Sequence, residues 1–361
     1  MSPRKGLNIP IVTALDEAGN LIEADQRNIV RHGIQQGHGA DSLFVAGTTG
    51  EYNRLSQPQI RRLLEVGVDE IKKVNQTLAE GIAPVETWVG ITAPTKAESI
   101  ELLELAIDLK AEVGVFAPYA IDDLPSSEVI QFFEREISPR LAASSLIVGL
   151  YDNPDIAAAH NANLNVPNVL IAALGQMPSV VGLKASANRQ AFGNYAKSFA
   201  KGMDAPFTLY AGNANLIFDI DEIQRENGIE NAEVAIAGVV SGTANVFPRE
   251  WKQAWEAVVA RDAEKIEFFK KFFEDFVRLT GFPGANGYGS KLIGGIKQAM
   301  LHLGIIGSAA VAPGTPAFTA DEAEILNENL TKLMNDAQFP AKITAGETSE
   351  NQQTIRTISN I

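Results

Sequence analysis

Lys184 ends a short apolar run, Ser179–Leu183, that is typical of a buried strand. A lysine at such a position either reaches solvent or is kept for chemistry. Burial favours the neutral amine, and a neutral amine can attack a ketone to form a Schiff base. A strand-end lysine is more commonly a solvated residue, so this interpretation depends on what other segments bring to the same place.

A second segment, Gly47-Thr-Thr-Gly-Glu51, directly follows the apolar run Ser42–Ala46. Its two glycines let the backbone turn sharply and approach a ligand closely. Consecutive backbone N–H groups in such a turn can bind an anion, and Thr48 and Thr49 add two hydroxyl groups. The segment is compatible with a simple strand-to-helix turn, and it also predicts a carboxylate site at Thr49 and Gly50.

A third segment places the phenol of Tyr151 at the end of the apolar run Ser145–Leu150. Tyr151 precedes Lys184 by about one strand-plus-helix unit. If the two runs form neighbouring parallel strands, the phenol and the amine meet at the same edge of the sheet. Tyrosine at a strand end more often serves packing, so the argument depends on this pairing.

These segments belong to an alternation of strand-like and helical patterns. Helical spacing of apolar residues occurs at Pro58–Val74, with Ser56 as N-cap, and at Lys96–Leu109. Eight such alternations predict a closed parallel barrel, the (β/α)8 TIM barrel. An open doubly wound sheet would alternate in the same way, but the dinucleotide-binding glycine pattern is absent after the first run. The eight apolar runs are Leu7–Thr13, Ser42–Ala46, Glu86–Ile91, Glu112–Ala117, Ser145–Leu150, Ser179–Leu183, Pro206–Tyr210 and Glu233–Val240.

We expect three parts along the chain. Residues 1–248 form the catalytic barrel, 249–338 a C-terminal helical appendage, and 339–361 a flexible polar tail. The appendage contains helical patterns at Arg249–Ala260, Ala263–Leu279 and Ser290–Leu303. Within the barrel, Asn215–Ile223 is expected as a helix, and the polar stretch 224–231 as a surface loop.

Composition excludes several classes of function. The chain has 361 residues, of which 45% are hydrophobic, an ordinary value for a globular core. A net charge of −14 argues against nucleic-acid and anionic-membrane partners. The chain has no cysteine, and histidines such as His32 and His38 lack metal-ligand spacing, so we expect no metal and no cofactor. Without a signal-type or membrane-spanning apolar run, we expect the protein in the cytoplasm.

The order and spacing of the motifs resemble those of the pyruvate-dependent class I aldolases of the dihydrodipicolinate synthase and N-acetylneuraminate lyase family. The resemblance covers about residues 7 to 318. The motifs that carry it are Thr13-Ala-Leu-Asp-Glu-Ala-Gly-Asn20, Gly47-Thr-Thr-Gly-Glu51, Ala117-Pro-Tyr119, Tyr151-Asp-Asn-Pro154, Gly182-Leu-Lys184, Ala211-Gly-Asn213 and Ser241-Gly-Thr-Ala-Asn245.

The resemblance implies roles for these residues. Lys184 would form a Schiff base with pyruvate or another 2-oxo acid, Tyr151 would shuttle protons, and Thr48 would relay them. Thr49 and Gly50 would hold the substrate carboxylate. The further substrate-binding residues would be Gly212, Asn213 and Ser241. The resemblance also implies a homodimer or a homotetramer.

Departures from the family concern the second substrate. Dihydrodipicolinate synthases usually have a second tyrosine after Tyr119, where this chain has Ala120, and an arginine where it has Ile156. Sialic-acid lyases have an acidic pair shortly after the glycine that corresponds to Gly212, where this chain has Asn213 and no carboxylate. We therefore expect an intact pyruvate half, each active site within one subunit, and Tyr119 at a dimer contact.

The sequence is compatible with three functions. The first is an aldolase or lyase that condenses pyruvate with an aldehyde or cleaves such a product, with a 2-keto-3-deoxy sugar acid as a possible substrate. The second is dihydrodipicolinate synthase (4-hydroxy-tetrahydrodipicolinate synthase) or a related hydro-lyase. The third is a non-catalytic 2-oxo-acid-binding barrel, which need not retain Lys184, Tyr151 and Thr48 together. Residues that could face the aldehyde are Asn153, Asn188, Arg189 and Asn213.

Overall fold

Eight parallel strands form a closed barrel in sequence order, and β8 pairs with β1. The computed structural model describes residues 2–159, 171–200, 207–229, 236–281 and 291–337. The closed barrel confirms the predicted TIM barrel and excludes the open sheet. The strands are β1 (Gly6–Pro10), β2 (Ser42–Val45), β3 (Glu86–Gly90), β4 (Val113–Phe116), β5 (Ile147–Asp152), β6 (Val180–Ala185), β7 (Thr208–Ala211) and β8 (Gly238–Val240).

The strand ends differ from the predictions where they matter most. β5 continues through Asp152 and β6 through Ala185, so Tyr151 and Lys184 lie inside their strands rather than just after them. Tyr151 and Lys184 are each other's register partners, so the β5–β6 ladder extends through both residues. The predicted eighth run began at Glu233, which lies outside the described residues.

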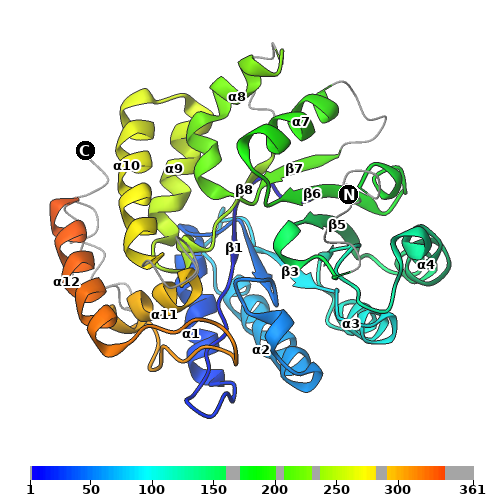
Figure 1. Cartoon of the computed structure of the whole chain (residues 1–361), viewed down its shortest axis with the longest axis horizontal. Helices are drawn as coiled ribbons and strands as arrows, with labels where there is room; N and C mark the ends of the chain where they lie inside the picture. The colour runs from blue at the N-terminus through cyan, green and yellow to red at the C-terminus, as the bar shows by residue number, and fades with distance from the viewer. Residues whose placement is uncertain (1, 160–170, 201–206, 230–235, 282–290, 338–361) are drawn as a thin grey trace.

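Helices connect the strands and surround the barrel (Figure 1). The predicted helix Pro58–Val74 is confirmed within one residue at each end, and Ser56 and Gln59 form a capping box before it. The predicted loop at 224–231 is partly wrong, because α8 continues to Glu226 and buries Gln224. The helices are α1 (Glu23–Ile34), α2 (Gln57–Asn75), α3 (Lys96–Asp108), α4 (Val129–Phe132), α5 (Ser138–Ala142), α7 (Arg189–Ala200), α8 (Ile220–Glu226), α9 (Pro248–Ala260), α10 (Ala263–Thr280), α11 (Leu292–His302) and α12 (Ala320–Asp336).

The C-terminal helices lie together on one flank of the barrel, with α10 packed against α9, α11 and α12 (Figure 1). Stacked aromatic rings join α10 to α9, since the Phe273 and Trp251 ring centroids are 4.0 Å apart. The predicted helices Ala263–Leu279 and Ser290–Leu303 correspond to α10 and α11, although residue 290 lies outside the described residues. The division at residue 248 stays a prediction; α9, which begins there, packs against β1.

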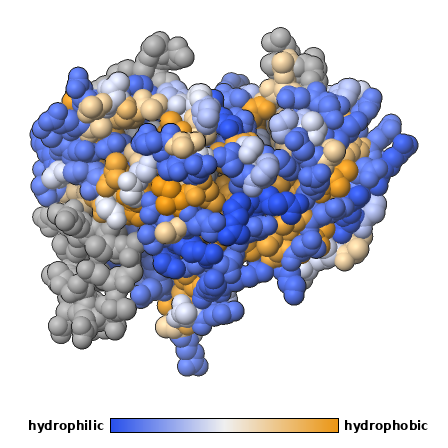
Figure 2. All heavy atoms as spheres, turned by 90° about the horizontal axis from the view of Figure 1, so that it is seen from below, coloured by the Kyte–Doolittle hydropathy of each residue, from blue (hydrophilic) through white to orange (hydrophobic). Residues whose placement is uncertain are grey.

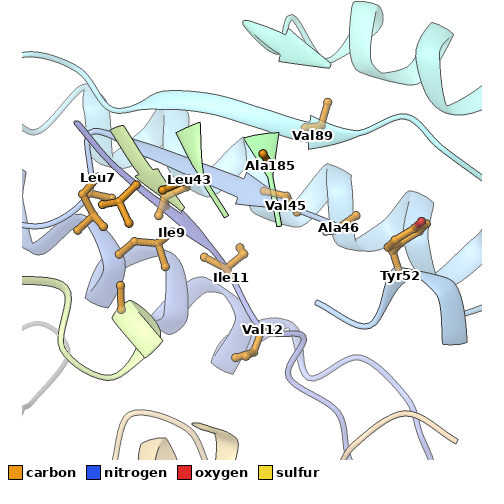
Figure 3. Close-up of a cluster of buried hydrophobic side chains, with 14 of the residues drawn as sticks. Leu7, Ile9, Ile11, Val12, Leu43, Val45, Ala46, Tyr52, Val89 and Ala185 are labelled. Carbon is orange, nitrogen blue, oxygen red and sulfur yellow. The ribbon is translucent and has the colours of Figure 1, made fainter. Parts of the chain in front are cut away.

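The main core lies between the barrel wall and the helices. Leu7, Ile9 and Ile11 from β1 and its end, with Leu43 and Val45 from β2, contribute buried side chains to it (Figure 3). The face of the molecule in Figure 2 is largely covered by hydrophilic residues, and hydrophobic residues show between them across its middle. In the described part of the chain, no helix combines the length and the apolar character needed to cross a membrane.

A smaller cluster fills the inside of the barrel and includes Phe44, Trp88, Tyr151 and Tyr210. The Trp88 and Tyr210 rings meet edge to face with centroids 5.0 Å apart. The Tyr210 hydroxyl donates to the carbonyl of Arg4, which precedes β1. This aromatic pair therefore fills the barrel toward the N-terminal ends of the strands and leaves the polar groups at the opposite end.

Glu86 lies beside this aromatic pair. Its Oε2 atom accepts hydrogen bonds from Trp88 Nε1 at 2.7 Å and from the Arg4 backbone N–H at 2.9 Å. Burial, with a smaller contribution from the Glu112 carboxylate, raises the pKa of Glu86 above its ordinary value. The folded state then binds this proton more tightly than the unfolded state, so the free energy of unfolding falls as the pH rises through the interval between the two pKa values.

We therefore expect Glu86→Gln to raise the melting temperature relative to wild type, because a neutral amide oxygen can still accept both hydrogen bonds. The gain should be larger at about pH 8 than at about pH 4, where the wild-type carboxyl is largely protonated. Thermal unfolding followed by circular dichroism measures this difference. Glu101→Gln, at an exposed position of α3, is the control. An equal gain at both pH values would contradict the assignment.

Candidate active site

Tyr151 and Lys184 face each other across the β5–β6 ladder. They are register partners, and a bulge next to Val148 and Gly149 sets this register, because β6 carries one additional residue, Val181, there. The Lys184 Nζ atom lies 3.8 Å from the centroid of the Tyr151 ring. Both side chains are buried, with exposed fractions of 4% for Lys184 and 3% for Tyr151. The prediction that neighbouring parallel strands bring the amine and the phenol together is confirmed, although the two residues meet within the ladder and not after it.

Three strand ends supply hydrogen bonds to the Tyr151 hydroxyl. The Thr48 hydroxyl, after β2, lies 3.0 Å from it. Asn153 Nδ2, after β5, donates to it at 3.0 Å, and Ser186 Oγ, after β6, donates at 3.4 Å. The pairing of Thr48 with Tyr151 agrees with the predicted relay. Ser186 did not stand out in the sequence, although its place directly after the Lys184 strand was an available signal.

The surroundings of Tyr151 change its acidity. Burial by itself would raise the pKa of the phenol, but the Lys184 charge and the hydrogen bonds with Ser186 and Thr48 outweigh burial. The net result is a pKa below the ordinary value of 10.0. A phenol with a lowered pKa gives up its proton more readily, which suits a group that must donate and accept protons.

The segment after β2 forms a tight turn beside two other loops. The Gly50 carbonyl accepts a hydrogen bond from Thr13 Oγ1 at 2.6 Å. A Cβ atom on Gly50 would lie 2.9 Å from the Ile11 carbonyl oxygen, so this position has no room for a side chain. Thr49 lies next to Gly242, because a Cβ atom there would come 3.3 Å from Thr49 Oγ1. The turn therefore presents Thr49 toward the loop after β8.

The other predicted binding residues occupy the ends of β7 and β8. A Cβ atom on Gly212 would lie 2.6 Å from Ser186 Oγ, so Gly212 packs directly against the end of β6. Asn213 follows it and is exposed. Ser241 is fully buried, and its hydroxyl lies 3.0 Å from Thr243 Oγ1. Gly212 is thus adjacent to Ser186, which contacts the Tyr151 hydroxyl, whereas Ser241 lies inside the loop after β8.

Asn188 and Arg189 both have partners on the neighbouring helices α7 and α8. The Asn188 side chain accepts a hydrogen bond from the backbone of α7 and caps that helix. The Arg189 guanidinium forms ion pairs with Asp219, Glu222 and Glu226 around α8. These contacts count against the expectation that the two residues contact the second substrate, which stays a prediction.

Asp152 is a buried residue that the sequence did not single out. Its two carboxylate oxygens accept hydrogen bonds from the hydroxyls of Tyr119, at 2.9 Å, and Tyr195, at 2.6 Å. Burial and the Asp152 charge raise the pKa of both phenols. Tyr119 has an exposed fraction of 0%, so the expectation that it packs at a dimer contact is wrong. Its ring serves the interior of its own chain.

Two apolar residues lie where the resemblance implied polar ones. Ala120 and Ile156 both pack against the cluster inside the barrel that includes Tyr151. The side of the site near β4 and β5 therefore carries apolar surface. In the segments that the structure describes, no group of three or more histidine, aspartate or glutamate residues is placed to hold a metal ion.

Comparisons with known proteins give a consistent family assignment. The sequence model of the Dihydrodipicolinate synthetase family matches residues 3–333. The 4-hydroxy-tetrahydrodipicolinate synthase of Methanothermobacter thermautotrophicus is 24% identical over 322 residues, which cover 87% of this chain and 98% of the relative. The enzyme of the same name from Dechloromonas aromatica is 28% identical over 263 residues, which cover 72% of this chain and 77% of the relative.

Solved structures share the fold at lower identity. Dihydrodipicolinate synthase from Bacteroides thetaiotaomicron superposes with a TM-score of 0.74 and 23% identity, covering 92% of this chain and 99% of that one. The wild-type sialic acid aldolase of Ruminococcus gnavus gives a TM-score of 0.72 at 17% identity, with 92% and 98% covered. An E. coli K12 prophage protein of the dihydrodipicolinic acid synthase family, in complex with pyruvate, gives 0.73 at 17%, with 91% and 98% covered.

The electrostatic coupling between Lys184 and Tyr151 can be tested without any substrate. In Lys184→Met we expect the tyrosinate absorbance transition of Tyr151 to move to higher pH, because the lowering charge is removed while burial remains. The Tyr151 signal is isolated by subtracting the titration of the same protein with Tyr151→Phe. Lys96→Met, outside the barrel at the start of α3, is the control. A transition at unchanged or lower pH would show that the amine does not set the acidity of the phenol.

Proposed function

Because the chain belongs to the Dihydrodipicolinate synthetase family, we propose that it is a Schiff-base-forming aldolase or lyase that joins a 2-oxo acid such as pyruvate to an aldehyde or cleaves such a product. The observation that carries this proposal is the contact between Lys184 and Tyr151, with Thr48 on the same phenol. A buried amine beside an acidified phenol is suited to forming an imine and moving protons around it.

The proposed reaction begins when Lys184 Nζ attacks the C2 carbonyl of the 2-oxo acid. Tyr151 gives a proton to the departing hydroxyl, and loss of water leaves a protonated Schiff base, which withdraws electrons from C3. The Tyr151 phenolate takes a proton from C3, and the resulting enamine carbon adds to the aldehyde to form the C–C bond. Tyr151, with Thr48 as relay, gives a proton to the new alkoxide. Water then releases the product from Lys184, and the cleavage reaction follows the same steps in reverse.

We propose that the substrate carboxylate binds at Thr49 and Gly50, where a tight turn presents backbone N–H groups and a hydroxyl. The partial exposure of Thr49 and its position beside Gly242 in the loop after β8 support this placement. Gly212, Asn213 and Ser241 stay as predicted binding residues. Gly212 has the strongest support of the three, because its backbone packs against Ser186, whose hydroxyl contacts the Tyr151 hydroxyl.

The central test is covalent trapping. With pyruvate and borohydride we expect a stable adduct that peptide mass mapping places on Lys184. Lys184→Arg should abolish the adduct and turnover, because an arginine guanidinium stays protonated. Tyr151→Phe should keep pyruvate binding and lose roughly 10²–10⁴-fold in turnover. An adduct on another lysine would refute the assignment, and the absence of any adduct would favour a non-catalytic 2-oxo-acid-binding barrel.

A second candidate function is 4-hydroxy-tetrahydrodipicolinate synthesis, because the curated relatives carry that name. The apolar contacts of Ala120 and Ile156 count against it, since they place no cation near the distal carboxylate of aspartate semialdehyde. An uncharged aldehyde, such as the one released from a 2-keto-3-deoxy sugar acid, fits this side of the site better.

We expect kcat/KM with pyruvate and aspartate semialdehyde to be at least ~10-fold below that with pyruvate and glyceraldehyde. A missing hydrogen bond to a charged group costs about 1.5–3 kcal/mol. Coupled assays with the two aldehydes measure the ratio. Ile156→Arg should shift it toward aspartate semialdehyde, and Ile156→Met controls for the change in size. Efficient synthesis by the wild-type protein would reverse the ranking of the two functions.

We further propose that the protein works in the cytoplasm as a homodimer or homotetramer with self-contained active sites. The family resemblance supports the oligomer. The burial of Tyr119 and the absence of a second phenol at Ala120 support a site completed within one chain. The net charge of −14 disfavours nucleic-acid and anionic-membrane partners.

A further inference from the structure

A second buried lysine, Lys297 on α11, lies outside the proposed catalytic set. Its Nζ atom lies 2.5 Å from Glu51 Oε2, and both side chains have an exposed fraction of 0%. Lys297 also donates to the Ala310 carbonyl at 2.8 Å, and Glu51 Oε1 accepts from the Ala312 N–H at 2.7 Å. Burial lowers the pKa of the Lys297 ammonium, and Glu51 opposes this shift. The Glu51 carboxylate therefore stabilises the buried Lys297 ammonium against the cost of removing it from water.

Stability alone is a weak explanation for such a pair. Well-packed apolar residues can often replace a buried ion pair at no cost in stability, because removing two charges from water is expensive. What the pair supplies is a fixed geometry between two parts of the chain far apart in sequence. One end is α11, in the C-terminal helices, and the other is the last residue of the Gly47–Glu51 turn.

A backbone hydrogen bond links Glu51 to Thr48. The Glu51 N–H donates to the Thr48 carbonyl at 3.0 Å and closes the turn between them. Glu51 has φ +59°, a left-handed conformation that is uncommon and costly for non-glycine residues. The contacts of its carboxylate with Lys297 and Ala312 hold it in this conformation.

The same helix contacts the loop after β8. Ile296, the neighbour of Lys297, has its Cδ1 atom 3.7 Å from the place of a Cβ atom on Gly242. Gly242 in turn lies beside Thr49. Two consecutive residues of α11 therefore touch both loops that border the proposed carboxylate site.

We infer that the Glu51–Lys297 pair is a positioning device by which α11 holds Thr48 against Tyr151 and Thr49 beside the loop after β8. Neither residue touches the reacting atoms, so both are positioning residues. The inference rests on the proposed function only for its effect on turnover. Its effect on the Tyr151 phenol is independent of any substrate.

Lys297→Met provides the test. Loosening the turn should weaken the hydrogen bond from Thr48 that helps to lower the pKa of Tyr151. We therefore expect the Tyr151 transition, isolated by subtraction of the Tyr151→Phe titration, to move up by about one pH unit. Thr48→Val should move it in the same direction. Pyruvate trapping at Lys184 should slow by ~10- to 100-fold, as displacement of a catalytic group by about 1 Å does.

The matched control is Lys291→Met. Lys291 forms a partly buried ion pair with Glu322 at 2.6 Å, between the start of α11 and α12. This variant also loses an ion pair of the C-terminal helices but should leave the Tyr151 transition and the trapping rate unchanged. If Lys297→Met does not fold, the double variant Glu51→Gln/Lys297→Met, which leaves no unpaired buried charge, is titrated instead.

The outcomes separate the inference from the proposed function. A Tyr151 transition that stays at the wild-type pH in the folded variant would overturn the inference. Failure of both variants to fold would also overturn it, by assigning the pair to stability. A shifted transition in a protein whose wild type forms no pyruvate adduct would refute the proposed function and support the positioning role.

Discussion

The register between β5 and β6 is the constraint on which the site depends. Side chains on a strand alternate between the two faces, so a shift of one residue exchanges the inside and the outside of the barrel. The bulge at Val181 makes Tyr151 the partner of Lys184. If Val181 instead paired regularly with Gly149, the count along the strands would place Asp152 opposite Lys184. The amine would then face a carboxylate rather than a phenol.

Close backbone packing maintains this arrangement on the other side of β6. A Cβ atom on Gly182 would lie 2.4 Å from Thr208 Oγ1, so only glycine lets β6 and β7 approach as they do. The aromatic rings of Trp88 and Tyr210 fill the barrel below, which leaves the polar groups at one end. The Lys184 amine and the Tyr151 phenol therefore lie together at that end, where the Lys184 charge helps to lower the pKa of the phenol.

The two halves of the site differ in how firmly they are built. Thr48 and Thr49 sit on a turn that is held through Glu51 by the C-terminal helices. On the other side, Ala120 and Ile156 offer apolar contacts, and Arg189 is held by acidic residues around α8. The side with Thr48 and Thr49 thus depends on buried polar contacts, whereas the side with Ala120 and Ile156 depends on apolar packing.

The sequence by itself determined the barrel and singled out Tyr151 and Lys184 as neighbours within it. Strand and helix periodicity are local properties, and the apolar runs that end in Tyr151 and Lys184 could be recognised without knowing the fold. The positions of the two residues within their strands, and the bulge that pairs them, could not be read in this way, because register is a property of two strands together.

Tertiary structure alone decided which distant residues meet. Glu51 and Lys297 are 246 positions apart, and nothing near either residue indicates the other. From the sequence, Arg189 could have contacted a substrate, but the fold brings acidic side chains of α8 beside it. Tyr119 could have contacted a partner subunit, but it is buried and its hydroxyl donates to Asp152. Pairing between charged or polar groups depends on distance in space, and chain spacing determines that distance only within a helix, a strand or a tight turn.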